Sequence, residues 1–352
     1  MPDDFNKLLK KYNYHLPVSL IAQAPAKPRD KAKLLVYHKD NGKVSYDIFR
    51  NLTKYLPPRA VLVFNETKVI PARLVLNKPT GGQVRVLYLD TKSNLIEVLA
   101  DRFIKIGMKL ALDIGTKGSK PIFFVVVKQI DNHYWLKPSF ALSKLPQIFE
   151  LYGHTPTPPY IKHTYLSEKQ LRQEYQTVFA KAAGSVAAPT AALHFTKGLL
   201  KKIKKQGFNI EFVTLHVNLG TFAPLTADQV ERHKLHQEWY TIDKTMAVRL
   251  AQAKKQGRPI IAVGTTVVRT LESAANKSGK LKKLIGTTDL FISEGYKFKF
   301  VDGLITNFHV PESSLLMLVA ALVGRTKLLE LYKKAISKKF RFFSFGDGMV
   351  IY

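Results

Sequence analysis

The spacing of hydrophobic residues between positions 72 and 150 differs from that in the rest of the chain. Short alternating or β-branched apolar runs follow one another there and are separated by turns rich in Gly, Asn and Asp. The runs cover 73–76, 83–89, 95–100, 109–114, 122–130 and 134–136. Five or six short strands without a helical period predict a small closed β-barrel.

After residue 165 the pattern alternates between helix and strand. Apolar faces with capping residues predict helices over 196–206, 243–256, 267–275 and 313–323. Continuous apolar runs predict buried strands over 212–217, 260–263, 290–292, 304–307 and 349–351, and the run 60–64 has the same character. This alternation is typical of an α/β fold in which helices flank a mixed sheet.

These two patterns predict the domain organisation. A chain of 352 residues suits two domains. We expect one discontinuous α/β catalytic domain, formed by residues 1–71 and 151–352, and an inserted β-barrel domain, formed by residues 72–150.

The charge of the chain is strongly basic. It has 55 Lys and Arg against 26 Asp and Glu, a net charge of +29, which favours a polyanionic partner such as nucleic acid or an anionic membrane surface. The excess is spread along the chain, and Lys outnumbers Arg 42 to 13. The Lys-rich stretches 197–205, 280–283 and 333–341 are therefore interpreted as solvated helix faces.

Composition also excludes several kinds of chemistry and location. The chain has no Cys, which removes disulfides, thiolate nucleophiles and Cys-based zinc sites. The longest apolar run, 315–323, is about half of what a membrane-spanning helix needs. The first residues are acidic and carry no signal-peptide pattern. We expect a cytoplasmic protein that does not associate with membranes.

Common catalytic fingerprints are missing. The chain contains no GxGxxG, no Walker P-loop, no HExxH and no GxSxG. A dinucleotide-binding domain, a P-loop NTPase, a zinc protease and an α/β-hydrolase therefore have no support in the sequence.

Small polar residues and histidines stand instead at the ends of three predicted strands, and a fourth segment, 184–195, is a long loop of small residues ending in a histidine. Ligands in open α/β folds bind at the carboxyl ends of strands, so the four segments are candidates to line one crevice. One strand-end histidine alone is more often a structural group, and it is the repetition that favours a site. The candidates are Pro189, Thr190, His194, Thr214, His216, Thr265, Thr266, Arg269, Asn307, His309, Glu312 and Ser313.

Two other patterns are weaker. His233, His236 and Glu238 have a spacing that would suit metal ligands on a helix, but no further ligand is indicated, so we expect no metal site. Tyr296 and Phe298 alternate with Phe300 as on a strand face, where they would stack on bases or pack in the core.

The four segments also carry a family resemblance that runs nearly from end to end. The chain resembles the S-adenosylmethionine:tRNA ribosyltransferase-isomerases of queuosine biosynthesis. Glycines usual in that family are replaced by Ala192 and Asn218. The matching stretches are 16–17, 20–22, 64–74, 157–161, 175–179, 187–191, 193–195, 213–217, 262–273, 306–309, 311–313 and 341–344, with Pro25, Arg29, His233, His236, Glu238, Gly346 and Asp347.

The resemblance implies a reaction. Such enzymes transfer and isomerise the ribosyl part of S-adenosylmethionine onto 7-aminomethyl-7-deazaguanine at the wobble position of tRNA. Epoxyqueuosine in tRNA, adenine and methionine are the products. S-adenosylmethionine is then a consumed co-substrate, no cofactor or metal is bound permanently, and the partner is a tRNA anticodon stem-loop. The family fold is an α/β domain with an inserted β-barrel, and we expect a monomer.

The resemblance also suggests roles for the candidates. Histidine can serve as base and acid near neutral pH, so His194, His216 and His309 are expected to supply the proton transfers, with the assignment among them open. Sugar and base would be held by Thr214, Thr265, Thr266 and Asn307, with Pro189, Thr190 and Ser313 as further binding residues. Arg269 would bind the methionine carboxylate or a phosphate, and Glu312 the methionine ammonium or the substrate amine.

Two other functions remain compatible with the residues. An S-adenosylmethionine-dependent tRNA methyltransferase would move the methyl group instead of the ribose. A non-catalytic tRNA-binding protein would account for the charge but would leave the strand-end histidines unexplained.

Overall fold

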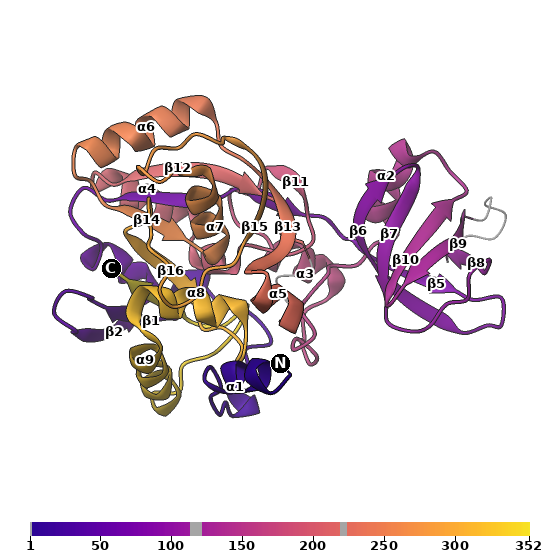
Figure 1. Ribbon diagram of the computed structural model, residues 1–352, viewed down its shortest axis with the longest axis horizontal. Coiled ribbons are helices and arrows are strands. Elements are labelled where there is room, and N and C mark those ends of the chain that lie inside the picture. The colour runs from indigo at the N-terminus through magenta and orange to yellow at the C-terminus, as the bar shows by residue number, and fades with distance from the viewer. Residues whose placement is uncertain (1, 113–121, 219–223) are drawn as a thin grey trace. The chain divides into compact units, whose positions relative to one another are not determined.

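The computed structural model describes residues 2–112, 122–218 and 224–352 (Figure 1). The chain forms two compact units. The larger unit comprises Met1–Lys68, Pro158–Leu166 and Glu174–Tyr352, and the smaller one comprises Val69–Thr157 and Ser167–Gln173. The segment 72–150, expected as an insertion, falls within the smaller unit, which also takes in residues on both sides of it.

A nine-stranded mixed sheet forms the centre of the larger unit. Its strand order is β15-β13-β12-β3-β14-β16-β17-β1-β2. The bounds are β1 Lys33–Tyr37, β2 Val44–Ile48, β3 Val61–Asn65, β12 Asn209–Leu215, β13 Lys234–Thr241, β14 Ile260–Val263, β15 Ile285–Leu290, β16 Gly303–Asn307 and β17 Gly348–Ile351. Two further strands, β4 Thr67–Val69 and β11 Ala182–Ser185, pair with each other.

The four strands β12, β3, β14 and β16 lie side by side and run parallel. Their carboxyl ends therefore meet at one edge of the sheet. β17 runs antiparallel to β16 and pairs Gly348 with Asn307, so the loop that precedes β17 reaches the same edge. The topology brings together segments that are far apart in the sequence.

Both faces of this sheet are covered. Alternate residues of β3 belong to two different cores: Val61 and Val63 pack with α6, α7, α8 and α9, whereas Leu62 and Phe64 pack with α4. Burial on both faces explains why these strands are continuous apolar runs. The helices of this unit are α1 Pro2–Lys10, α4 Lys197–Lys205, α5 Ala227–Glu231, α6 Lys244–Lys255, α7 Thr265–Ala274, α8 Ser314–Val323 and α9 Arg325–Ser337. Helix α3, Glu168–Glu174, belongs to the smaller unit except for its last residue.

Short 3-10 helices connect these elements. They are η1 Val18–Leu20, η2 Arg29–Lys31, η3 Phe49–Lys54 and η5 Thr190–His194, with η4 Leu142–Lys144 in the smaller unit.

Helix starts were predicted best from the sequence. The side chains of Thr196, Asp243 and Ser313 each accept a hydrogen bond from a backbone N–H in the first turn of α4, α6 and α8. The prediction for 267–275 was late by two residues, because α7 begins at Thr265, directly after Gly264.

Two expectations were wrong. The strand predicted over 290–292 lies earlier, as β15, where it pairs with β13. Tyr296, Phe298 and Phe300 do not lie on a strand. Instead, the Tyr296 hydroxyl donates to the buried carboxylate of Glu272 (3.1 Å), and Phe300 is part of the core. Side-chain contacts from α7 therefore override the alternating pattern.

The smaller unit contains the closed six-stranded barrel that the sequence predicted. Its order is β10-β7-β6-β5-β8-β9, with bounds β5 Arg73–Asn77, β6 Gln83–Lys92, β7 Leu95–Ala100, β8 Lys109–Leu112, β9 Ile122–Ile130 and β10 His133–Pro138. Helix α2, Leu145–Tyr152, contributes Leu145, Ile148 and Phe149 to the barrel core, which keeps the chain in this unit beyond residue 150. Positions 113 and 114, expected at the end of one strand, lie outside the described residues.

Candidate active site

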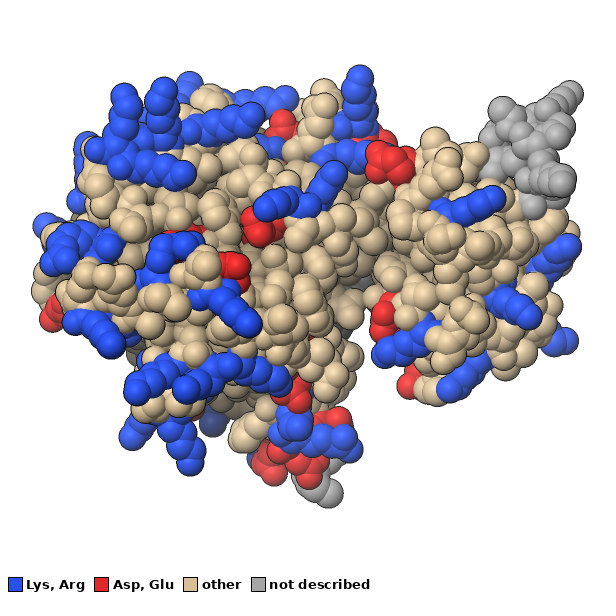
Figure 2. Space-filling view, turned by 90° about the horizontal axis from the view of Figure 1, so that it is seen from above, with Lys and Arg blue, Asp and Glu red and all other residues tan. Residues whose placement is uncertain are grey.

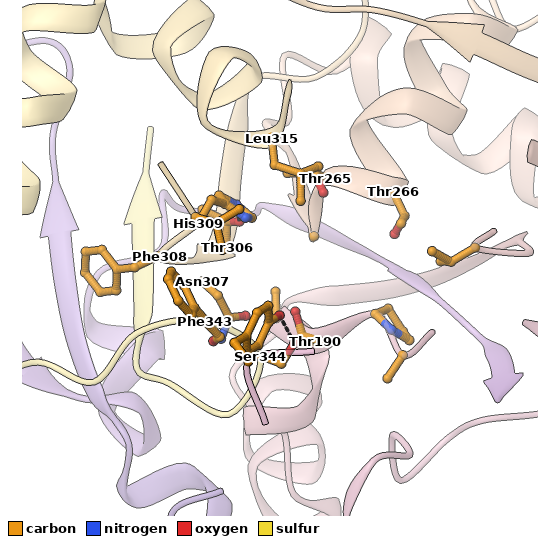
Figure 3. Close-up of a pocket in the computed structure, with 17 residues that line it drawn as sticks. Thr190, Thr265, Thr266, Thr306, Asn307, Phe308, His309, Leu315, Phe343 and Ser344 are labelled. Carbon is orange, nitrogen blue, oxygen red and sulfur yellow. Dashed lines mark hydrogen bonds between the residues drawn. The ribbon is translucent and has the colours of Figure 1, made fainter. Parts of the chain in front are cut away.

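A pocket opens at the carboxyl ends of β14 and β16, within the larger unit (Figure 3). It contains about 620 Å³ of empty space, including space open to solvent. Its lining residues are Tyr160, Ala188, Pro189, Thr190, Ala191, Val217, Gly264, Thr265, Thr266, Thr306, Asn307, Phe308, His309, Val310, Leu315, Phe343 and Ser344.

One side of the pocket is the start of α7. β14 ends at Val263, and Gly264 turns the chain with a φ of 95°, a conformation that favours glycine. Thr265 and Thr266 are then the first two helical residues, and Figure 3 shows them on one side of the cavity. Unpaired backbone N–H groups at a helix start attract negative or electron-rich groups. This side therefore suits a carboxylate or sugar oxygens.

Another side of the pocket is formed by the end of β16 and carries a histidine. Thr306 Oγ1 lies 2.7 Å from His309 Nε2, which fixes the imidazole against the strand (Figure 3). The backbone of His309 is also held, because its N–H donates to the Tyr332 hydroxyl oxygen (2.8 Å) and its carbonyl accepts from the Tyr14 hydroxyl. Burial lowers the pKa of His309 from 6.5 to about 4. The imidazole is therefore neutral at pH 7.

Asn307 presents an unused acceptor beside it. Its Nδ2 donates to the Phe343 carbonyl (3.0 Å), whereas its buried Oδ1 has no hydrogen-bond partner among the described residues. Buried polar atoms in proteins are nearly always paired. A ligand N–H or O–H in the pocket would satisfy this oxygen.

His194 lies behind Asn307 and does not line the pocket. Its Nε2 is 3.5 Å from Asn307 Nδ2, and its ring packs on Phe49 with centroids 4.6 Å apart. Burial, followed by the charges of Arg341 and Arg29, lowers the pKa of His194 to about 3. The structure therefore places this histidine as support for Asn307.

His216 follows β12 and lies at the same edge of the sheet, outside the pocket lining. Its Nδ1 is 2.8 Å from Thr67 Oγ1, and its ring stacks on Trp239 at 5.2 Å. Burial lowers its pKa below the usual value, so this imidazole too is neutral at pH 7. The next residue, Val217, does line the pocket.

Pro189 and Thr190 line the pocket, whereas Thr214 and Arg269 are engaged elsewhere in the protein. Thr214 is buried within β12, opposite Thr241 of β13. The Arg269 guanidinium pairs with the Glu238 carboxylate and donates to the carbonyls of Leu290 (3.2 Å) and Thr288 (3.3 Å), so it is not aimed at the pocket.

Glu312 and Ser313 lie just beyond the pocket. The Glu312 carboxylate accepts from Asn13 Nδ2 (2.6 Å). The Ser313 hydroxyl caps α8 by accepting from the Leu316 N–H (3.2 Å) and donates to the Val310 carbonyl (2.8 Å). Both groups already have protein partners.

Sequence reasoning missed several lining residues. Thr306 lies at the end of a predicted strand, directly before Asn307, but it was not among the candidate site residues. Tyr160 and Ser344, whose hydroxyls are 2.7 Å apart, lie in stretches that matched the family but carry no pattern of their own. Asn65, the last residue of β3, and Thr67, the first of β4, were in another matching stretch, although they do not line the pocket. A polar residue directly after a buried strand was the available signal.

No metal site or membrane span is found where the structure can be described. Within 2–112, 122–218 and 224–352 no group of three His, Asp or Glu could hold a metal ion. The helical spacing considered for His236 and Glu238 was wrong, because both lie on strand β13 and Glu238 pairs with Arg269. Of the helices in those ranges, none is long and apolar enough to cross a membrane.

The fold and the pocket define an α/β protein with a strand-end ligand site, neutral histidines at that edge and a separate β-barrel. Comparison with known proteins identifies its family. A family model described as queuosine biosynthesis protein matches residues 9–351, so the chain belongs to that family.

Curated relatives and a solved structure agree with this assignment. The chain is 43% identical to the S-adenosylmethionine:tRNA ribosyltransferase-isomerase of Thermoanaerobacter sp., covering 97% of this chain and 98% of that protein. It is 44% identical to the enzyme of that name from Carboxydothermus hydrogenoformans, covering 97% and 99%. The crystal structure of S-adenosylmethionine tRNA ribosyltransferase from Thermotoga maritima is similar, with a TM-score of 0.56, 33% identity and coverage of 97% and 100%.

Proposed function

We propose that this protein transfers and isomerises the ribosyl group of S-adenosylmethionine onto 7-aminomethyl-7-deazaguanine in tRNA. The products are epoxyqueuosine in tRNA, adenine and methionine. The observation that carries this proposal is a strand-end pocket with a neutral histidine and an unused amide acceptor, in a chain whose relatives are named for this reaction. S-adenosylmethionine is consumed, and no resident cofactor is part of the proposal.

The reaction needs proton transfers that the histidines can supply. The sulfonium acidifies the adjacent 5′ carbon, so a neutral base near it can form an ylide. Departing adenine needs a proton or a hydrogen bond, and a ribose hydroxyl must act as nucleophile to close the epoxide. His309 lines the pocket and His216 lies on the same edge of the sheet. We assign proton transfer to these two and a supporting role to His194.

The polar lining of the pocket is assigned to binding. Asn307 Oδ1 would accept from the adenine amino group or a ribose hydroxyl, with Thr190, Thr265 and Thr266 contacting sugar and base. The methionine carboxylate would lie at the start of α7. The ion pair with Glu238 favours a structural role for Arg269 over the anion contact expected from the sequence.

The acceptor proposed is a tRNA anticodon stem-loop. Figure 2 shows Lys and Arg in several groups over the visible surface of the larger unit, and the net charge of +29 suits a phosphate-rich partner. A tRNA substrate would place the enzyme in the cytoplasm. The monomeric state stays a prediction.

A double-label experiment tests the proposal. The protein is incubated with tRNA that carries the 7-aminomethyl-7-deazaguanine base and with S-adenosylmethionine labelled separately in ribose and in methyl. We expect ribose label in tRNA and one free adenine per transfer, and no transfer to tRNA that carries guanine at that position. Methyl label in tRNA would identify a methyltransferase instead. Binding of tRNA without any transfer would identify a non-catalytic binding protein.

A further inference from the structure

We propose that Thr67 is a positioning residue that holds His216 in the tautomer with the proton on Nδ1, which leaves the Nε2 lone pair as the proton acceptor. This inference rests on the proposed function, because it assigns the basic atom of a histidine in that reaction. It concerns residues outside the pocket lining. Four observations carry it.

The position of Thr67 is fixed by its neighbour Asn65. The buried Asn65 side chain accepts from the N–H of Thr67 (3.1 Å) and from the N–H of Leu215 (3.0 Å), and it donates to the Leu215 carbonyl (2.9 Å). One amide therefore ties the backbone of Thr67 to the residue directly before His216. The hydroxyl and the imidazole, 149 residues apart in sequence, are held within hydrogen-bond distance.

The direction of the hydrogen bond follows from a third group. Thr67 Oγ1 lies 2.8 Å from His216 Nδ1 and 3.4 Å from the Ala182 carbonyl oxygen. A carbonyl can only accept, so the hydroxyl must be the donor in its contact with Ala182. Both contacts can be made at once only when Thr67 Oγ1 accepts from His216, which places the imidazole proton on Nδ1 and leaves Nε2 unprotonated.

Ala182 is itself held in place. It belongs to β11, and its N–H donates to the Glu66 carbonyl (3.2 Å), next to Thr67. The Ala182 carbonyl, which accepts from Thr67, is therefore part of the small β11–β4 sheet. Because backbone hydrogen bonds hold both Thr67 and Ala182 in place, the fold sets the tautomer of His216.

The faces of the His216 ring are restrained as well. The Trp239 ring stacks on the imidazole with an interplanar angle of 21°. The backbone N–H of His216 also donates to the Trp239 carbonyl (2.9 Å). Gly184 approaches the ring so closely that a Cβ there would lie 2.9–3.1 Å from Nε2, Cε1 and Cδ2. These contacts oppose a ring flip that would exchange Nδ1 and Nε2. Burial keeps the imidazole neutral, so its tautomer determines which atom is basic.

Nuclear magnetic resonance of the full chain with ¹⁵N-labelled histidine tests this directly. The His216 signals are assigned by their loss in the His216→Gln variant. In the wild type we expect a protonated Nδ1 and an unprotonated Nε2. Thr67→Val, which keeps the shape and removes the hydroxyl, should shift the population toward the Nε2–H tautomer, whereas Thr67→Ser should restore the wild-type spectrum. Thr91→Val is the matched control, because it removes a hydroxyl that bonds Tyr88 on a barrel strand.

Kinetics supply a second measurement. We expect Thr67→Val to lower kcat by about 10- to 100-fold while the KM for S-adenosylmethionine stays within about twofold, because an orienting contact acts on proton transfer and not on binding. Thr67→Ser should recover most of the loss. A wild-type spectrum with the proton on Nε2 would overturn the proposal even if no variant folds, and so would a Thr67→Val spectrum identical to wild type. If the spectra show the expected tautomers but no ribose label reaches tRNA, the proposed function is wrong, whereas the conclusion that Thr67 sets the His216 tautomer remains.

Discussion

The Arg269 guanidinium and the Glu238 carboxylate form an ion pair that is almost completely buried, with side chains 6% and 2% exposed. Glu238 also accepts from the backbone N–H of Asn218 (3.0 Å), two residues after His216. The pair thus joins α7, which begins at the pocket, to the segment that follows β12. Arg269 therefore links two segments next to the pocket without lining the pocket itself.

Removal of either partner should destabilise the protein strongly. Arg269→Ala or Glu238→Ala leaves an unpaired buried charge, and we expect each to lower the free energy of unfolding by about 3–5 kcal/mol in urea titrations. Arg232→Ala, which breaks an exposed ion pair with Asp228, is the control and should cost at most about 1 kcal/mol. Equal effects of the buried and exposed changes would contradict this assignment.

Burial of His194 should make stability depend on pH. Its pKa is lowered from 6.5 to about 3 in the folded state, so between these values the unfolded chain binds more protons than the folded one. Stability should therefore rise with pH across this window and be lost as the pH falls. His194→Gln should flatten the slope of the urea midpoint against pH, and His163→Gln is the matched change at an exposed position. An unchanged slope in His194→Gln would count against a buried neutral imidazole.

Gly184 should be intolerant of a side chain. Its φ is 144°, and a Cβ would press on the His216 ring. Displacement of a reacting group by about 1 Å costs on the order of 100-fold in rate, so we expect Gly184→Ala to lower kcat by up to that factor. Gly82→Ala, at a position with no atom near the added Cβ, should be neutral. Wild-type turnover in Gly184→Ala would argue against a constrained ring.

Ser313→Ala should act on stability through α8. The hydroxyl caps the first turn of the helix, and loss of such a cap costs about 1 kcal/mol. Urea unfolding measures the change, with Ser278→Ala in an exposed turn as a control expected to stay within about 0.5 kcal/mol. A rise in the KM for S-adenosylmethionine without loss of stability would instead support the binding role that the sequence suggested.

The basic charge should contribute only in part to tRNA binding. If three to five phosphates are contacted, the logarithm of the affinity should fall with the logarithm of salt concentration with a slope of about −2 to −4. Filter binding or fluorescence anisotropy at several salt concentrations gives the slope. A slope near zero would contradict a phosphate-binding surface. A much steeper slope would show that most of the excess lysines contact phosphates.

Elements with local signals were predicted well. Thr196 was recognised as a helix cap, and helices were predicted to start at Asp243 and Ser313, because the signals at a helix start involve residues only a few positions apart. The barrel was recognised because alternation and turns are local too. β15 was misplaced, because its position depends on pairing with β13 and not on its own pattern.

The sequence by itself determined that this is a two-part α/β and β-barrel protein of a known enzyme family, with polar residues at the ends of buried strands. It could not determine which of those residues reach the pocket. His309 lies there on Thr306, His194 is buried against Phe49, and Arg269 is paired with Glu238. Those outcomes depend on contacts between segments far apart along the chain, and only the packed sheet brings such segments together.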